Sequence, residues 1–289
     1  MKGVIKVFGS NIPTLPLVKI LSRRPMMVTY QFDYAEGTRM NDKKGLKYLL
    51  APLLERLALW PADLVLVTAK WLEEKIQTVY AKKTILLPNW VDLSSVALAS
   101  KEVVRNNHLI LYAGRLNWIK GINVLIDAFA RVKLLHPDAR LVICGAGEEE
   151  EKLCAQAEAL GLTDVQFKGR VSNADVLELM QSAAIFVLPT LTMEGHPKSL
   201  IEAMVCGAAC IVSNVPGNSD AIIDGETGLL FPPGDVDALA GSLNCLLKDS
   251  NLRKRLSSNA HLSARTFNFA HIVNLEIQTL HNLYVKLPK

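Results

Sequence analysis

Short apolar runs alternate with amphipathic segments from about residue 108 onward. The predicted strands are residues 109–114, 141–145, 165–169, 185–190, 209–213 and 228–231. The predicted helices between them, with apolar side chains at helical spacing, are residues 121–135, 148–160, 173–182 and 199–206. This alternation indicates βαβ units and therefore an α/β fold, a parallel sheet with helices on both faces. Ligands of such sheets bind beyond the carboxyl ends of the strands, so the following loops should meet at one crevice.

The first hundred residues show a less complete version of the same pattern. Residues 25–33 contain a strand, 63–69 form a buried strand, and 84–92 form a strand that runs into a turn. Residues 43–59 have apolar positions at helical spacing, with Lys43, Lys44 and Lys47 at the start. The polar stretch 93–107 is expected to be a hinge. The pattern therefore predicts about half of an α/β domain, followed by a whole one.

Composition and charge limit the class of protein. The chain has 289 residues, half of them apolar, enough for one large domain or two ordinary ones. Residues 1–107 hold 16 Lys and Arg against 9 Asp and Glu, whereas the rest holds 16 against 19. The basic N-terminal part favours an anionic partner such as a membrane surface, a lipid phosphate or nucleic acid, or else forms a solvated basic face. No aromatic residues are interleaved with the basic ones, so the excess of Lys and Arg in residues 1–107 is the only feature that favours nucleic-acid binding.

The cysteines and the N-terminus point to a reducing compartment. The five cysteines are Cys144, Cys154, Cys206, Cys210 and Cys245. Their number is odd and no pair has CxxC spacing, so we expect small buried side chains and no zinc site. Lysine, asparagine and two prolines interrupt the N-terminal apolar stretch, which is therefore no signal peptide. No apolar run is long enough to span a bilayer, which predicts a cytoplasmic protein.

The stretch AGRLNWIKG (113–121) follows a predicted strand and opens a predicted helix. Gly114 permits a tight turn, and a helix N-terminus beyond it attracts anions. Arg115 and Lys120 project from the same turn, which suits a diphosphate. Alternatively, they are two solvated surface cations.

The stretch CGAGEEEEKL (144–153) also follows a strand. Gly145 and Gly147 begin a dinucleotide-binding pattern, but Glu150 stands where its third glycine belongs. Four consecutive acidic residues would repel a pyrophosphate, so we interpret the stretch as a tight turn into a helix with an acidic first turn. The pair Asp235 and Asp237 precedes another helix and is interpreted as an N-cap rather than a metal site.

The stretch EGHPKSLIEAMVCG (194–207) carries two glutamates separated by seven residues. Pro197 is expected in the first turn of a helix, which would leave the amides of Lys198, Ser199 and Leu200 free to face a ligand. A carboxylate accepts paired hydrogen bonds from a vicinal diol, so Glu194 and Glu202 are candidate ligands for a ribose or a sugar. The alternative is one acid favoured by the helix dipole and one solvated helix glutamate.

These motifs, together with LPNWVD (87–92), FKGRVS (167–172) and VPGNSDAIIDGETGLLFPPGD (215–235), occur in an order that resembles family 4 of the retaining, nucleotide-sugar-dependent glycosyltransferases. That resemblance covers roughly residues 25–289 and implies the GT-B architecture, with two Rossmann-like domains. It implies a shortened N-terminal acceptor-side domain over 1–106 and a donor-binding domain over 107–270. A C-terminal helix over 271–289 is expected to cross back to the N-terminal domain.

The resemblance also implies roles for individual residues. Arg115 and Lys120 should contact the donor diphosphate and stabilise the departing nucleotide, and Glu194 should hold the donor sugar at the reacting face; these three are the catalytic candidates. Glu202 should bind the ribose. The donor-binding candidates implied by the family are Gly114, Arg115, Lys120, Gly145, Arg170, Val171, Glu194, Gly195, His196, Pro197, Lys198, Ser199, Leu200 and Glu202. No metal or cofactor is implied, and the choice between UDP and GDP stays open.

The chain departs from the family pattern in two places. It begins near the later strands of the family's N-terminal domain, which is consistent with a fragment, a half that pairs with a separate polypeptide, or a true short form. The family histidine near the reacting sugar is replaced by Gln31, which cannot take a proton at neutral pH, and Asp33 is a candidate substitute.

The sequence therefore predicts a glycosyltransferase that moves a sugar from a nucleotide sugar to a glycan or lipid-linked acceptor. A donor-binding subunit that needs a partner chain is the first alternative, and a nicotinamide-dependent oxidoreductase is the second. The helix over 43–59 either docks on an anionic membrane, as a peripheral protein would, or packs its leucine stripe on its own sheet.

Overall fold

The computed structural model of the chain describes residues 4–8, 15–31, 33, 46–94, 96 and 104–285. The chain forms two compact units, Met1–Asn89 with Ala270–Lys289, and Trp90–Phe269. The sequence placed this boundary near residue 106, but Val91 and Val96 are buried in the core of the second unit. No helix in the described ranges is long and apolar enough to cross a membrane.

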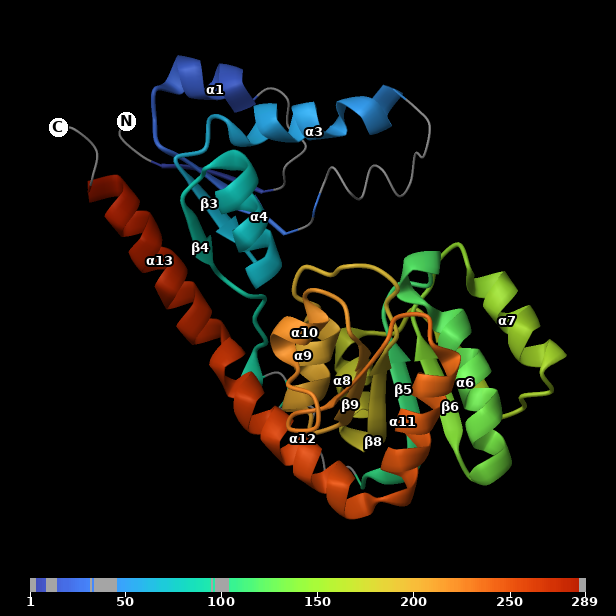
Figure 1. The fold of residues 1–289 in the computed structure, drawn as a ribbon. Helices are drawn as coiled ribbons and strands as arrows, with labels where there is room; N and C mark the ends of the chain where they lie inside the picture. Colours follow the sequence, from blue (N-terminus) through green and yellow to red (C-terminus); the bar gives the residue numbers. More distant parts are fainter. Residues whose placement is uncertain are drawn as a thin grey trace. The chain divides into compact units, whose positions relative to one another are not determined.

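The first unit contains a four-stranded parallel sheet in the order β1-β2-β3-β4 (Figure 1). Its strands are β1 (Ile5–Phe8), β2 (Met26–Tyr30), β3 (Leu64–Val67) and β4 (Thr84–Leu86). The helices α1 (Leu15–Ser22), α3 (Leu46–Leu59) and α4 (Lys70–Tyr80) connect consecutive strands. Both central strands are buried along their whole length because their side chains are apolar on both faces. Strand β1 and helix α1 are additions to the elements that the sequence predicted.

Two small cores cover the two faces of this sheet. On one face Val28 and Val65 pack with Leu15, Leu72 and residues of the connecting helices. On the other face Met27 and Leu66 pack with Ile272 of α13 (Phe269–Val285), the helix drawn in red in Figure 1. The C-terminal helix thereby completes the first unit.

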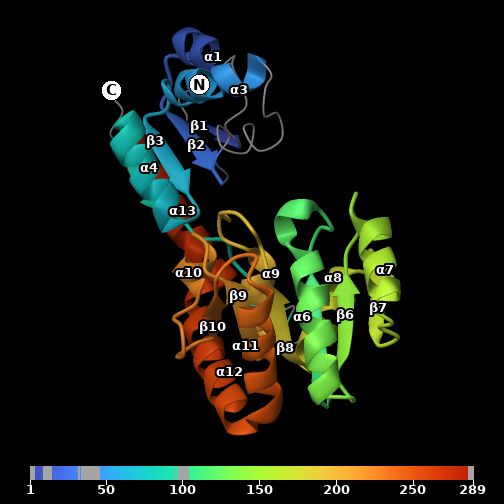
Figure 2. The same cartoon turned by 45° about the vertical axis from the view of Figure 1, so that its right-hand side comes forward.

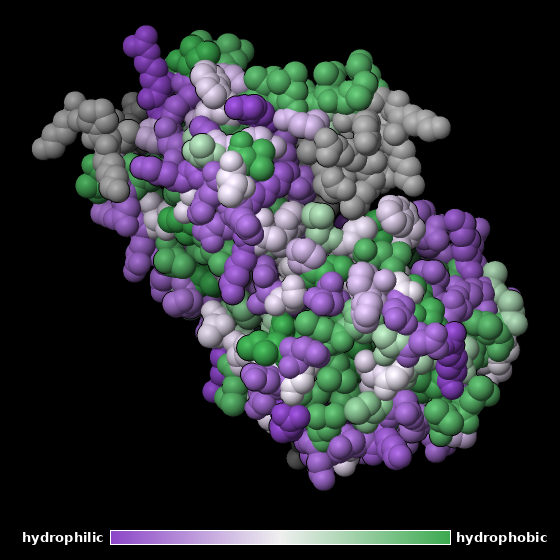
Figure 3. Space-filling model, viewed as in Figure 1, coloured by the Kyte–Doolittle hydropathy of each residue, from purple (hydrophilic) through white to green (hydrophobic). Residues whose placement is uncertain are grey.

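An ordinary amphipathic helix buries its apolar side, but helix α3 turns its leucine stripe toward solvent. Ala51, Glu55 and Ala58 are buried against the unit, whereas the leucine stripe is exposed. The alternative in which this stripe packs on its own sheet is therefore wrong. Figure 3 shows hydrophobic residues along the outer surface of α1 and α3. Residues 43–45, which carry two of the predicted lysines, lie outside the described residues.

The second unit contains a six-stranded parallel sheet in the order β10-β9-β8-β5-β6-β7. Its strands are β5 (Asn106–Ala113), β6 (Arg140–Cys144), β7 (Val165–Gly169), β8 (Ala183–Leu188), β9 (Ala209–Ser213) and β10 (Leu229–Phe231). The α/β prediction is confirmed, and β7 and β9 begin and end at the predicted residues. In the centre, Leu111 pairs with Val142 of β6 on one side and with Phe186 of β8 on the other.

Helices cover both faces of this sheet (Figure 2). One layer contains α6 (Ile122–Leu135), α7 (Glu150–Ala159) and α11 (Val236–Lys248). The other contains α8 (Asn173–Ser182), α9 (Lys198–Val205) and α12 (Ser250–Ala264). The chain runs from β5 toward β7 in one direction and from β8 toward β10 in the other, so the strand order reverses between β5 and β8. Such a reversal leaves a crevice at the carboxyl ends of the two strands.

Candidate functional site

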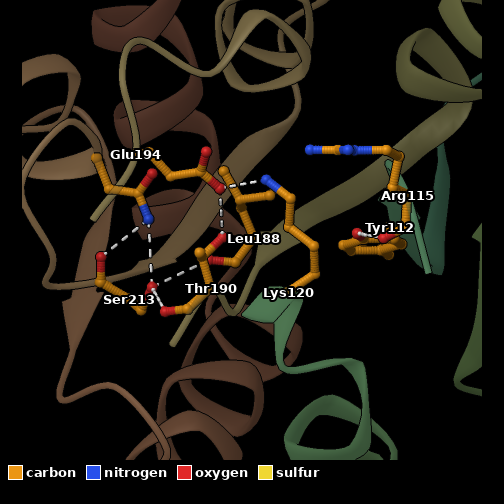
Figure 4. A network of polar contacts seen from close by, with 8 residues as sticks. Tyr112, Arg115, Lys120, Leu188, Thr190, Glu194 and Ser213 are labelled. Atoms are coloured by element: carbon orange, nitrogen blue, oxygen red, sulfur yellow. Dashed lines mark hydrogen bonds and ion pairs between the residues drawn. The ribbon is translucent and has the colours of Figure 1, made fainter. Parts of the chain in front are cut away.

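The loops that follow β5 and β8 bring two charged side chains together. Lys120 ends a short 3-10 turn (Trp118–Lys120) after β5, and Glu194 lies in the loop after β8. The ammonium Nζ of Lys120 forms an ion pair with Oε1 of Glu194 (Figure 4), and both side chains are more than four-fifths buried. Two of the three catalytic candidates thus meet at the point where the strand order reverses.

Neighbouring loops hold the Glu194 carboxylate in place. The hydroxyl of Thr190 donates to Oε1 of Glu194 at 2.9 Å, and the Glu194 amide donates to the Pro216 carbonyl at 2.9 Å. Ser213 at the end of β9 donates to the Thr190 carbonyl at 2.5 Å. Asn218 in turn donates to the Ser213 carbonyl at 3.1 Å. Thr190, Ser213 and Asn218 are completely buried, so the carboxylate is supported by a network that is shielded from water.

Arg115 approaches the same place from the turn after β5. Its carbonyl accepts a hydrogen bond of 2.8 Å from the hydroxyl of Tyr112, which is completely buried. Burial raises the pKa of Tyr112, and the negative charge of Glu194 raises it further, so the hydroxyl stays a donor. The guanidinium is exposed, and Figure 4 shows it directed toward the Lys120 ammonium. Both predicted cations thus come from the segment after β5, and Lys120 is the one that pairs with the carboxylate.

Two glycines allow the loops to approach one another. Gly145, with φ of +140°, would place a Cβ 1.8 Å from the Gly114 carbonyl oxygen. Gly217, with φ of +91°, would place one 2.3 Å from the Glu194 carbonyl oxygen. No L side chain fits either position, so both glycines are required for this loop packing.

The start of α9 differs from the prediction. Pro197 stands just before the helix, at the N-cap position, with ψ of 111°. The Leu200 amide donates to the Pro197 carbonyl at 3.1 Å, so it is not directed at a ligand. The amides of Lys198 and Ser199 precede this first helical bond. The set of amide donors expected at this helix start is therefore reduced from three to two.

Glu202 lies in α9 and is only 6% exposed. Burial raises the pKa of its carboxyl group, and the Lys198 ammonium, 3.5 Å from Oε1, acts in the opposite direction. The Lys198 side chain is 55% exposed, so it can turn away from Glu202 at low cost. Glu202 is thus a buried carboxylate with one exposed cation beside it, which also lies 5.7 Å from the centroid of the Trp90 ring.

His196 packs against the core of its own unit. It is 5% exposed, and its ring centroid lies 4.8 Å from that of Phe267. Burial lowers the pKa of His196 to about 4, so the ring is neutral at pH 7. Gly195, just before it, stands beside the Gly217 backbone, because a Cβ on Gly217 would lie 2.6 Å from the Gly195 carbonyl oxygen.

The remaining candidates lie on other elements of the chain. Arg170 and Val171 follow β7, two strands away from β5 at the edge of the sheet. Asp235 accepts from the Ala238 amide at 2.9 Å, which confirms the predicted N-cap of α11. In the first unit Gln31 is exposed, whereas Asp33 is buried and its Oδ1 lies 2.7 Å from the Lys75 ammonium.

The cysteines follow the prediction in part. All five are free thiols, and Cys144, Cys206 and Cys210 are buried. Burial raises the pKa of Cys144 to about 11 and that of Cys206 to about 12. Cys245 is exposed on α11, so the expectation of a buried thiol is wrong there, because that position faces away from the sheet.

Sequence comparisons assign the second unit to a known family. Residues 98–262 match the family described as glycosyl transferases group 1. The chain is 26% identical over 299 residues to the capsular polysaccharide biosynthesis glycosyltransferase CapM of Staphylococcus aureus, which covers 97% of this chain and 77% of the relative. It is 26% identical over 277 residues to a phosphatidyl-myo-inositol mannosyltransferase of Mycobacterium leprae, covering 94% and 71%.

Solved structures show the same architecture. A sucrose-phosphate synthase from Thermosynechococcus elongatus superposes with a TM-score of 0.84 at 23% identity, over 99% of this chain and 74% of that one. Anabaena HepE in complex with UDP and glucose superposes with a TM-score of 0.78 at 22% identity, over 96% and 78%. The fold is that of the GT-B glycosyltransferases.

Proposed function

Because the chain belongs to the group 1 glycosyl transferases, we propose that it transfers a sugar with retention of configuration and without a metal ion. Its donor is a nucleotide sugar. The observation that carries the proposal is the ion pair of Lys120 and Glu194 where the strand order reverses, with the Arg115 side chain directed toward it. A nucleoside diphosphate that leaves a sugar develops negative charge on its phosphate oxygens, and fixed cations stabilise that charge.

In this proposal Arg115 and Lys120 bind the diphosphate, and the exposed guanidinium of Arg115 makes the first contact. Glu194, held by Thr190, orients the hydroxyls of the donor sugar at the reacting face. The two cations supply the charge that a metal ion supplies elsewhere, which is why a metal-independent reaction fits this site.

Glu202 is proposed to bind the ribose of the donor. The Lys198 side chain is exposed and swings aside, and the Glu202 carboxylate then accepts hydrogen bonds from the two ribose hydroxyls. The backbone of residues 196–199 contacts the sugar and the phosphates. On the opposite side, Gly114 and Gly145 leave room for the donor because they have no side chains. Arg170 and Val171 border the base.

The acceptor is proposed to be a glycan or a lipid-linked molecule. This proposal is supported by two relatives named above, one a glycosyltransferase of capsular polysaccharide biosynthesis and the other a phosphatidyl-myo-inositol mannosyltransferase. UDP and GDP are both candidate nucleotides.

Calorimetric titration of UDP, GDP, ADP and NADH into the purified chain tests this proposal. We expect one nucleoside diphosphate to bind, and Lys120→Ala and Glu202→Ala to weaken it at least tenfold each, since each removes a charged hydrogen-bond partner. Substitution of the exposed Arg131, whose partner is Asp237 on α11, is the matched control. Binding of NADH alone would contradict the proposal.

Retention of configuration and metal independence are tested with the sugar nucleotide whose nucleoside diphosphate binds. Product anomeric configuration followed by NMR tests retention, and activity after treatment with EDTA tests metal independence. An inverted product, or activity that EDTA removes and a divalent cation restores, would overturn the corresponding part.

A further inference from the structure

Helix α3 has two apolar faces, of which one is buried and one is exposed. Leu46, Leu49 and Leu53 are 72%, 71% and 53% exposed, and Leu57 is 43% exposed. At about 100° per residue these positions, with Leu50, fall within an arc of roughly 100° on the helix. The opposite side, with its alanines and Glu55, is the one that packs on the unit. Nothing in the described part of the chain covers this apolar stripe.

Helix α1 and Trp60 extend this stripe. Leu17, Ile20 and Leu21 of α1 are 58%, 60% and 76% exposed, and α1 packs beside α3. Trp60, directly after α3, is 59% exposed. Figure 3 shows the hydrophobic surface running over both helices. We call this surface the leucine face: the exposed apolar residues of α1, α3 and Trp60.

The charges around the leucine face are almost all positive. Residues 15–24 and 46–60 contain five Lys and Arg and one acid, Glu55. Glu55 is completely buried and bonded to the hydroxyls of Tyr30 and Tyr80 and to Lys75, so it does not reach the surface. Lys19 pairs with Asp63, while Arg23 and Arg56 are exposed.

We propose that the leucine face docks on the surface of an anionic phospholipid bilayer, with α3 lying in the plane of the interface. A helix with leucine and tryptophan on one side and cations at its margins is the usual form of an interfacial membrane contact. Two copies of this chain pressed together by the same face would bring Arg23 and Arg56 toward their own equivalents, whereas anionic headgroups neutralise them. The proposal goes beyond the transfer reaction and stands without it.

Flotation of the purified chain with lipid vesicles tests this. We expect the chain to float with vesicles that contain phosphatidylglycerol, much less with phosphatidylcholine alone, and less at high salt. The double variant Leu49→Glu with Leu53→Glu should weaken flotation by more than about tenfold, because it places two charges on the apolar stripe. The matched control is Leu134→Glu, a leucine that is 84% exposed at the end of α6 in the second unit.

Thermal unfolding and nucleotide binding separate docking from folding and from the proposed reaction. Both should be unchanged in the double variant, since the two side chains are exposed. If the double variant fails to fold, a fluorescence experiment on the native chain tests the same contact. Brominated lipids should quench the tryptophan fluorescence of the native chain, and Trp60→Phe should remove that quenching.

Three results would overturn the proposal. The first is a folded chain that does not float with anionic vesicles, and the second is a double variant that floats as well as the native chain. The third is a native dimer in sedimentation that the double variant dissociates, which would mean that a second copy covers the leucine face.

Discussion

Lys120 and Glu194 are 74 residues apart in the chain and form an ion pair between the loops of two adjacent parallel strands. The carboxylate also accepts from the Thr190 hydroxyl, and Figure 4 shows the Arg115 side chain directed toward the ion pair. This arrangement pairs the two charges and places them where a phosphate and a sugar are proposed to bind.

Removing both members of this pair should cost less than the sum of the two single removals. Lys120→Ala leaves a mostly buried carboxylate without its cation, and Glu194→Gln leaves a cation without its carboxylate; each should lower the unfolding free energy by roughly 2–3 kcal/mol. We expect the double variant to cost about 1–2 kcal/mol less than the sum of the two. Urea unfolding of the four proteins measures this, and strict additivity would show that the pair is not coupled. Both single variants should also lose activity by about 10²-fold or more.

Thr190→Val tests the second support of Glu194. The side chain is completely buried and valine has nearly the same shape, so the loss is confined to one hydrogen bond to the carboxylate. We expect kcat with the sugar nucleotide to fall by about tenfold. The affinity for the free nucleoside diphosphate should not change, because this ligand carries no sugar for Glu194 to bind. Thr190→Ser keeps the hydroxyl and should restore most of the activity. Equal weakening of nucleotide binding would place Glu194 at the phosphates instead.

Gly217→Ala should disturb the loop of Glu194 directly. The new Cβ would meet the Glu194 carbonyl oxygen at 2.3 Å and would force a positive φ on alanine. Gly225 is a matched control, because it also has positive φ, +71°, but nothing lies within 4 Å of an added Cβ. We expect Gly225→Ala to cost about 1 kcal/mol and Gly217→Ala at least about 2 kcal/mol more, with weaker donor binding only in the latter. Similar losses in the two melting curves would show that the loop adapts freely.

The buried imidazole of His196 should make stability depend on pH. Its pKa is lowered from 6.5 to about 4, so the unfolded chain binds a proton before the folded chain does. The stability that this group contributes is complete above pH 6.5 and is lost as the pH falls toward 4, by up to about 3 kcal/mol.

The variant His196→Gln isolates this contribution, since other groups titrate in the same window. Burial raises the pKa of Glu202 and makes it contribute with the opposite sign. Unfolding free energy measured from pH 7 to pH 4 should fall less steeply in His196→Gln than in the native chain. The exposed His281 gives the control variant, and equal slopes in all three proteins would contradict a buried neutral imidazole.

The sequence predicted the second unit well because its strands are short, apolar and bounded by glycine, proline or serine. It also placed Arg115, Lys120 and Glu194 in loops at one edge of the sheet, since the carboxyl ends of parallel strands lie along the same edge. It did not predict that Lys120 and Glu194 pair with each other, because that depends on the conformations of two separate loops. Thr190 and Gly217 were missed for the same reason: their roles are hydrogen bonds and close contacts between loops.

The first unit was harder to predict. Strand β1 has four residues and the following helix begins close to two prolines, so neither gives a strong periodic signal. In α3 the spacing identified the leucine stripe but not the direction in which it points. Ala51 and Ala58 are small enough to let the helix approach the sheet on the other side, and Glu55 is buried there by its tyrosine and lysine partners. Hydrophobicity alone would have assigned the leucines to the core.

The two ends of the second unit are joined by backbone hydrogen bonds. Val91 donates to the Phe267 carbonyl at 2.9 Å and accepts from the Phe269 amide at 3.1 Å, and the Trp90 and Phe269 rings lie 4.4 Å apart. The first and last residues of this unit therefore lie side by side. Adjacent termini are typical of domains that tolerate excision and circular permutation. Residues 90–269 expressed alone should keep the hydrogen bonds between their two ends and bind the nucleotide. Such a fragment would be a minimal donor-binding domain for screening sugar nucleotides.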